Sequence, residues 1–241
     1  MTALFISDLH LDASRPAATD CFLRFLAGPA RDAASLYILG DLFEAWTGDD
    51  AAGPHEQEIL AALRRFSDSG RHCSFVRGNR DFLVGSHFAA ETGAVLLPDE
   101  ALVDVEGTPA LLMHGDTLCT DDRAYQRYRR LVHRPAVQAF YLGLPVRFRS
   151  GIAAWARRRS AAANAGKPPA IMDVNTVAVT EALRRHGVRL LIHGHTHRPG
   201  THALELDGQM ARRIVLGDWY AQGSVLQWMA GGPELRTLAF G

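Results

Sequence analysis

Residues 4–10 read Leu4-Phe5-Ile6-Ser7-Asp8-Leu9-His10, and this stretch decides how the rest of the chain is interpreted. Its first three residues are apolar and predict a short buried strand. Residues i and i+2 of an extended chain lie on the same side. The sequence therefore predicts that Asp8 and His10 leave the strand together, with a carboxylate and an imidazole facing one point.

The composition is that of an ordinary soluble globular protein. The chain has 241 residues, of which 47% are hydrophobic and 22% charged, and this length suits one ample domain or a domain with a large insertion. We expect neither secretion nor a membrane span, because the N-terminus runs straight into a strand and no 18 apolar residues are consecutive. Three scattered cysteines, Cys21, Cys73 and Cys119, favour a reducing cytoplasm and exclude a zinc ribbon.

A net charge of zero conceals a basic segment between Arg123 and Lys167. This segment holds eleven Arg and Lys residues and no Asp or Glu, whereas the rest of the chain holds fifteen basic and 26 acidic residues. A block of one sign indicates a charged partner, because a solvated helical face normally mixes signs. Breaks at Pro135, Pro145 and Gly151 predict two or three helices here, and Lys167 is the chain's only lysine.

Short apolar runs alternate with helical periodicity in the first hundred residues. Strands are expected at 4–6, 36–39 and 73–76, separated by helices that begin at Thr19-Asp20 and cover 55–69. This order predicts a sheet with parallel strands and crossover helices. Later elements are expected as a hairpin at 101–105 and 110–113, a helix at 175–186, a strand at 189–192, and β structure from 201 onward with a tight turn at Asp207-Gly208.

Five of the predicted strands end in potential metal ligands. The carboxyl ends of strands in open α/β sheets meet at one pocket, so these side chains are expected to converge. The set lacks a thiolate and exceeds one tetrahedral site, so it suits a pair of Mn, Fe, Zn or similar ions. Two cations roughly 3.5–4 Å apart promote attack on phosphorus. The residues are Asp8, His10, Asp41, Asn79, His114, His195 and His197, with Gly40, Gly78, Gly115 and Gly194 beside them.

In this order, the motifs resemble those of the calcineurin-like metallophosphoesterases. They are Asp-x-His at 8–10, Gly-Asp-x-x-Glu at 40–44, Gly-Asn-Arg-Asp at 78–81, His-Gly-Asp at 114–116 and Gly-His-Thr-His at 194–197. The resemblance implies an α/β fold, a four-layer αββα sandwich. Residues 1–122 and 168–241 would form the core, and residues 123–167 a basic helical lid inserted over the pocket.

The resemblance also implies how the ligands are shared between two Mn²⁺ ions, although other divalent ions also suit these residues. One ion would take Asp8, His10, Asp41 and His197, and the other Asp41, Asn79, His114 and His195, with Asp41 bridging. The implied catalytic residues are Asp41, Asn79, Arg80, His114 and His195.

Later features resemble the branch of this family that cleaves the pyrophosphate of UDP-2,3-diacylglucosamine in lipid A biosynthesis. They are Arg80, the Ser160…Asn164…Lys167 spacing and Leu216-Gly217-Asp218-Trp219-Tyr220. The implied products are UMP and 2,3-diacylglucosamine 1-phosphate, formed by attack of a metal-activated hydroxide on the α phosphorus. The implied substrate-binding residues are Asn79, Arg80, Asp122, Ser160, Asn164, Lys167 and His195.

Arg80 is a departure from many family members, which carry Gly-Asn-His-Glu with a His that can protonate a leaving group. An arginine cannot act as a general acid at neutral pH, because its pKa stays above ~12, but its guanidinium can fork onto a phosphate. A phosphate-monoester leaving group, with a second pKa of about 6, needs no proton. Arg80 therefore favours cleavage of a pyrophosphate over an ordinary monoester.

The basic segment also carries aromatic and aliphatic residues, a pattern that suits acyl chains or an interfacial helix drawn to anionic lipid. We therefore expect a lipid-linked UDP-sugar substrate and a peripheral location on the cytoplasmic face of the inner membrane. No nucleic-acid motif accompanies the basic residues, and no obligate protein partner is evident. Two alternatives stay open: a metallophosphoesterase acting on nucleotides or nucleic acid, and a non-catalytic scaffold that docks a membrane or a partner.

Overall fold

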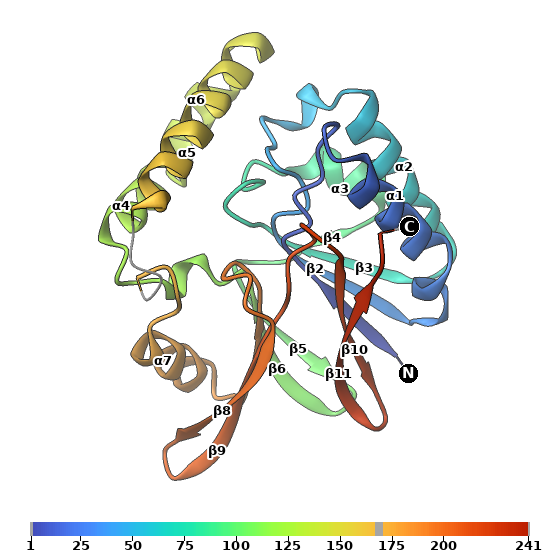
Figure 1. The fold of residues 1–241 in the computed structure, drawn as a ribbon, viewed down its shortest axis with the longest axis vertical. Helices are drawn as coiled ribbons and strands as arrows, with labels where there is room; N and C mark the ends of the chain where they lie inside the picture. The colour runs from blue at the N-terminus through green and yellow to red at the C-terminus, as the bar shows by residue number, and fades with distance from the viewer. Residues whose placement is uncertain (1, 167–170, 241) are drawn as a thin grey trace.

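The computed structural model describes residues 2–166 and 171–240 and contains two β-sheets that pack face to face, with helices outside them (Figure 1). The first sheet has six strands in the order β11-β10-β1-β2-β3-β4. Strands β1, β2 and β3 are parallel, as the alternation of strands and helices predicted. The bounds are β1 Ala3–Ile6, β2 Ser35–Leu39, β3 His72–Val76, β4 Val95–Leu96, β10 Gly223–Met229 and β11 Gly232–Leu238.

The second sheet has five strands in the order β5-β6-β7-β9-β8. Strands β6 and β7 are parallel, so their carboxyl ends lie at the same edge. The bounds are β5 Glu100–Val105, β6 Thr108–Met113, β7 Leu190–His193, β8 Gly200–Leu206 and β9 Gln209–Val215.

Helices on the two outer faces complete the architecture, and a group of three stands apart from the sheets (Figure 1). The α-helices are α1 Pro16–Ala27, α2 Pro54–Asp68, α3 Ser86–Thr92, α4 Arg123–Val132, α5 Pro135–Leu142, α6 Val146–Ala165 and α7 Thr176–His186. Short 3₁₀ turns are η1 Pro29–Asp32, η2 Asp49–Ala51 and η3 Asp116–Leu118. Within the described ranges, none of the helices combines the length and apolar character needed to cross a bilayer.

Three separate hydrophobic cores establish the layers. Alternate residues of β1 face opposite ways: Ile6 packs among α1 and α2, and Phe5 packs between the two sheets. In the second sheet, Ile192 joins the core between the sheets, whereas Leu191 packs against α7. The period-2 alternation of side chains thus fills a core on each side of each sheet. The predicted αββα sandwich is confirmed.

Several local predictions were wrong. Helix α1 begins at Pro16 rather than at Thr19-Asp20, because a proline fits the first turn, where its missing N–H is not needed. Gly151 does not break the basic segment, since α6 runs through it. Helix α3 and strand β4 were not predicted, and β11 was predicted only as part of the β structure from 201 onward.

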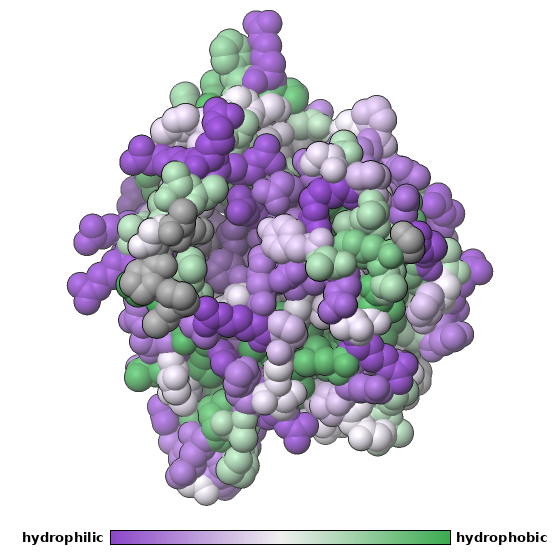
Figure 2. Space-filling model, in the orientation of Figure 1, coloured by the Kyte–Doolittle hydropathy of each residue, from purple (hydrophilic) through white to green (hydrophobic). Residues whose placement is uncertain are grey.

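Helices α4 and α6 are attached to the rest of the chain by polar contacts of two arginines. The guanidinium of Arg149 in α6 is 1% exposed and donates to the carbonyl of Thr47, 2.7 Å away, and to Oδ1 of Asp50, 2.8 Å away. On α4, Nε of Arg129 donates to Oδ2 of Asp116 at 2.6 Å. In the space-filling view, hydrophilic atoms line a hollow between these helices and the sheets (Figure 2).

Candidate metal centre

The seven predicted ligands follow strands β1, β2, β3, β6 and β7 of both sheets. Five of them have φ between 49° and 68°, the left-handed region that non-glycine residues seldom adopt. Such strain persists where the surrounding structure enforces it, commonly at functional sites. The five are Asp8, His10, Asp41, His195 and His197.

Asp8 and His10 converge for a different reason from the predicted alternation of an extended strand. Strand β1 ends at Ile6, and Asp8 and His10 have φ of 55° and 49°. The turn that follows β2 fixes this part of the backbone, because the amide of Asp8 donates to the carbonyl of Gly40 at 3.1 Å. The convergence was predicted correctly, but two left-handed residues produce it.

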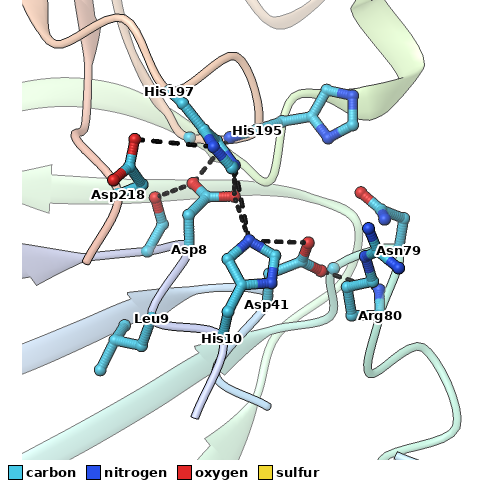
Figure 3. Close-up of polar contacts among 12 residues, drawn as sticks. Asp8, Leu9, His10, Asp41, Asn79, Arg80, His195, His197 and Asp218 are labelled. Carbon is cyan, nitrogen blue, oxygen red and sulfur yellow. Dashed lines mark hydrogen bonds and ion pairs between the residues drawn. The ribbon is translucent and has the colours of Figure 1, made fainter. Parts of the chain in front are cut away.

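One group of ligands gathers around Oδ1 of Asp8 (Figure 3). Nε2 of His197 lies 3.3 Å from this oxygen, and Nε2 of His10 lies 3.9 Å from it. The two imidazole Nε2 atoms are themselves 3.5 Å apart. All three residues point at one position, as coordination of a single cation requires.

The second group gathers around Nε2 of His114. This nitrogen lies 3.0 Å from Oδ1 of Asn79, 3.2 Å from Nδ1 of His195 and 3.7 Å from Oδ1 of Asp41. On its other side, Nδ1 of His114 lies 2.9 Å from the carbonyl of Leu39. That contact fixes the ring with Nε2 facing the other ligands.

The two carboxylate oxygens of Asp41 face different groups. Oδ1 lies on the His114 side, and Oδ2 lies 3.8 Å from Nε2 of His10. The backbone amide of Arg80 donates to Oδ1 at 2.8 Å and holds the carboxylate in this orientation. Asp41 therefore connects the two groups of predicted ligands.

The buried carboxylates at this edge of the sheets favour the binding of cations. Asp8, Asp41 and Asp81 are each at most 2% exposed, and Oδ1 of Asp8 has no hydrogen-bond partner within the described residues. Burial raises the pKa of Asp81, and the neighbouring Asp41 carboxylate raises it further, to about 7. Ionised carboxylates packed this closely and out of water are costly without a compensating charge. The donor set of carboxylate, imidazole and amide oxygen suits divalent ions such as Mn²⁺.

The histidines of the second group differ in protonation. Burial alone would lower the pKa of His114, but the carboxylates of Asp41, Asp8 and Asp116 outweigh it and raise the pKa to about 9. Burial and the neighbouring His114 charge lower the pKa of His195 to about 4. His195 is thus ready to offer a lone pair, whereas His114 must first lose a proton.

Three residues around the predicted ligands orient them. Oε2 of Glu44 lies 3.1 Å from Nδ1 of His10, and Oδ2 of Asp218 lies 3.6 Å from Nδ1 of His197. The ring of Tyr220 stacks on His10 with centroids 5.2 Å apart. The motifs Gly-Asp-x-x-Glu and Leu-Gly-Asp-Trp-Tyr contained these residues, but only the fold shows which ligand each contacts.

Asp81, which was named only as the last residue of Gly-Asn-Arg-Asp, connects two strand ends. Its carboxylate accepts hydrogen bonds from the amides of Leu42 and Gly78, both at 2.8 Å. The bonds place the turn after β2 beside the turn after β3. Asp41 and Asn79 are positioned by this shared carboxylate.

Arg80 projects beside the ligands with part of its guanidinium uncommitted (Figure 3). NH1 lies 3.7 Å from Oε1 of Glu44. Nε is buried and lacks a hydrogen-bond partner among the residues that the structure describes. A buried donor left in this way, next to a cation site, is suited to an anionic ligand.

Three of the remaining predicted substrate-binding residues, Asp122, Ser160 and Asn164, belong to or flank the three helices. Asp122 caps α4, accepting a hydrogen bond from the amide of Tyr125 at 3.1 Å. Ser160 is exposed near the end of α6. Asn164 belongs to α6, but its side chain, like the whole of Lys167, lies outside what the structure describes.

A family model described as calcineurin-like phosphoesterase matches residues 1–199. The chain belongs to the calcineurin-like phosphoesterase family. Relatives in this family include UDP-2,3-diacylglucosamine hydrolase of Escherichia coli O81 (strain ED1a), 53% identical over 240 residues, and that of Enterobacter sp. (strain 638), 51% identical over 240 residues. In both cases the match covers 100% of each chain.

Among solved structures, this phosphoesterase is similar to Yfce, a phosphoesterase from E. coli, with 17% identity and a TM-score of 0.48. That match covers 100% of this chain and 94% of the other. The family membership and the two groups of Asp and His side chains together support divalent-metal binding at the strand ends.

Proposed function

We propose that the chain hydrolyses the pyrophosphate bond of UDP-2,3-diacylglucosamine, giving UMP and 2,3-diacylglucosamine 1-phosphate for lipid A biosynthesis. The observation that carries this proposal is full-length identity of 51–53% to hydrolases named for that substrate. The ligand groups at the strand ends supply a site of the required kind.

The proposed reaction needs a nucleophile and stabilisation of charge on phosphorus. A pair of divalent cations, when bound, would supply a hydroxide at neutral pH and would offset the negative charge that develops. Asp8, His10, Asp41 and His197 would hold one ion, and Asp41, Asn79, His114 and His195 the other. We assign both ions as Mn²⁺, an assignment that metal analysis of the purified protein tests directly.

Arg80 is assigned to the phosphate that leaves. Its Nε lacks a hydrogen-bond partner among the described residues and is available to an oxyanion, and NH1 lies 3.7 Å from Oε1 of Glu44 beside the ligand groups. The departing 2,3-diacylglucosamine 1-phosphate needs no proton from the enzyme, because a phosphate monoester is a stable anion at neutral pH. A residue that cannot donate a proton is therefore appropriate here.

The site of attack is tested by hydrolysis in ¹⁸O-labelled water. Attack on the α phosphorus places the label in UMP, whereas attack on the β phosphorus places it in the sugar phosphate. We expect label in UMP alone, dependence on added Mn²⁺, and loss of turnover in Asp41→Ala. Turnover of cyclic nucleotides or DNA in preference to the lipid would favour the nucleotide alternative. Cellular function that survives Asp41→Ala and metal loss would favour a scaffold.

Residues 123–167 are proposed to be a lid over the metal centre, separate from a core of residues 1–122 and 168–241. Helices α4–α6 lie beside the strand ends that carry the ligands (Figure 1). Asp122, Ser160, Asn164 and Lys167 would contact the substrate together with Asn79, Arg80 and His195. Ser160→Ala and Lys167→Ala are then expected to raise KM and leave Mn²⁺ binding unchanged.

The same helices are proposed to rest on the anionic cytoplasmic face of the inner membrane. Basic side chains there are interspersed with large apolar ones that face solvent, a composition that suits the lipid interface. Figure 2 shows hydrophobic atoms among hydrophilic ones in the part of the molecule where these helices lie. The exposed apolar residues are Tyr128, Leu131, Phe140, Leu142, Val146, Phe148, Ile152 and Trp155.

Sedimentation with vesicles tests the membrane proposal. We expect the protein to bind vesicles that contain phosphatidylglycerol and to bind neutral phosphatidylcholine vesicles weakly. Phe140→Ser with Phe148→Ser should weaken the binding. Met210→Ser is a matched control, because Met210 is 68% exposed but belongs to β9. Equal loss in both variants would refute the assignment of the surface.

A further inference from the structure

Asp116 is the point at which α4 joins the edge that carries the second ligand group. Oδ2 of Asp116 accepts hydrogen bonds from the hydroxyl of Tyr125 and from Nε of Arg129, each at 2.6 Å. The backbone carbonyl of Asp116 accepts a third, from Nε2 of Gln126 at 2.7 Å. Three side chains within two turns of one helix thus contact a single residue.

Asp116 follows His114 by two residues and is 3% exposed. Its carboxylate is paired with the guanidinium of Arg129, whose Nε lies 2.6 Å from Oδ2. Hydrogen bonds to a buried charged acceptor are among the strongest in proteins. The position of α4 and the conformation of the turn after His114 are therefore tied together.

Tyr125 also contacts the other histidine of the second group. Its ring lies on the ring of His195, with centroids 6.1 Å apart and planes inclined by 30°. Nδ1 of His195 in turn lies 3.2 Å from Nε2 of His114. Tyr125 thus reaches one ligand through its ring and the turn of the other ligand through its hydroxyl.

We propose that Tyr125 and Asp116 are positioning residues for the second metal site, so that α4 is a structural part of that site as well as of the lid. Tyr125 keeps the His195 ring against His114, and Asp116 holds Tyr125 in place. The first ligand group, around Asp8, makes none of these contacts within the described residues. The inference rests on the ligand sets given under the proposed function.

Calorimetric titration of the metal-stripped protein with Mn²⁺ tests the proposal. Wild type is expected to bind two ions. Tyr125→Phe, which keeps the ring, and Asp116→Asn, which keeps an acceptor oxygen, should each weaken one binding event by roughly tenfold or more, the range seen when residues that orient ligands are changed. The other event should be unchanged, and the double variant should lose no more than either single one, because the two residues act as one unit.

Tyr128→Phe is the matched control, since Tyr128 lies on the same helix, is 49% exposed, and should bind both ions as wild type does. Thermal unfolding without metal separates a site effect from general loss of structure. Unchanged binding in Tyr125→Phe and Asp116→Asn would overturn the positioning role alone, and so would an equal weakening of both events. Wild-type protein that binds fewer than two ions would overturn the ligand sets and this inference together.

Discussion

Gly194 leaves no room for a side chain beside Asp8, because a Cβ atom there would lie 2.3 Å from Oδ2 of Asp8. The same atom would lie 2.1 Å from Oγ of Ser7. The backbone amides on both sides of this contact are engaged: Gly194 donates to the carbonyl of His114 at 2.9 Å, and His195 donates to Oδ2 of Asp8 at 2.8 Å. A shift of Gly194 or of Asp8 would therefore disturb both groups of predicted ligands.

We therefore expect Gly194→Ala to displace Asp8 and to lower Mn²⁺ affinity by roughly 10- to 100-fold, with a loss of stability of about 1–3 kcal/mol from overpacking. Calorimetry and thermal unfolding measure the two effects. Gly151→Ala is the matched control, because a Cβ atom there would meet no described atom within 4 Å beyond the nearby backbone of α6 itself. It should bind Mn²⁺ normally and gain up to about 1 kcal/mol of stability. Equal behaviour of the two variants would contradict the packing argument.

Arg80→Ala should lower kcat by about 10²- to 10³-fold, the usual loss when a charge-stabilising donor is removed. Mn²⁺ binding should be unaffected, because only the backbone amide of Arg80 contacts the ligand Asp41. Arg80→Lys should have a higher kcat than Arg80→Ala but a lower one than wild type, because a lysine keeps the positive charge but cannot bind a phosphate through two nitrogens as a guanidinium does. Steady-state kinetics beside a metal titration separate the two properties. A loss of Mn²⁺ binding in Arg80→Ala would argue against the assignment to phosphate.

The metal-stripped protein should lose stability as pH rises from 6.5 to 9. The folded-state pKa of His114, about 9, exceeds its ordinary value of 6.5. The folded state therefore binds the extra proton in this range, so the stabilisation is complete below pH 6.5 and is lost as pH rises through about 9. Chemical unfolding after chelation at several pH values measures it, and Asp41→Asn should flatten the slope. A flat profile in wild type would mean that His114 is neutral.

Mn²⁺ binding should have the opposite pH dependence. A ligating imidazole must be neutral, so uptake of the ion is expected to expel the proton of His114 and to strengthen as pH rises. Titration in two buffers of different ionisation enthalpy counts the released protons. Binding with no proton release at pH 7.5 would contradict the charged state of His114.

Arg149 should control how firmly α6 is held. Arg149→Met removes the donors to Thr47 and Asp50 and should cost roughly 1–2 kcal/mol, a modest value because the Asp50 carboxylate is largely exposed and can turn to water. Hydrogen exchange in α5 and α6 should accelerate. Arg147→Met is the control, because Arg147 is exposed on the same helix. Similar exchange rates in the two variants would show that Arg149 is not an anchor.

The sequence predicted that these polar side chains gather at the strand ends, because each of them follows a short apolar strand with a glycine nearby. It did not predict how Asp8 and His10 converge, since left-handed backbone at two non-glycine residues is imposed by the neighbouring turn after β2. Roles such as that of Tyr125 on His195 depend on contacts between residues 70 apart in the chain, which no local pattern encodes.

The sequence analysis also failed to predict helix α3, because a residue distant in the sequence stabilises its N-terminus. Its N-terminal amides are satisfied by the carboxylate of Asp49, which accepts from Gly85, His87 and Phe88. Such a cap normally comes from the residue just before the helix, where a sequence search looks for it. Gly151, by contrast, was wrongly predicted to break a helix. One glycine weakens an otherwise helical stretch without ending it.

The left-handed conformation of five ligands has a consequence for anyone who wishes to transplant this chemistry. The main-chain torsions determine the direction in which each of these side chains points. If the seven residue types were copied onto ordinary strand ends of another scaffold, their side chains would therefore point away from one another. Whole turns, together with the glycines and the buried carboxylate of Asp81 that clamp them, would have to be moved as units.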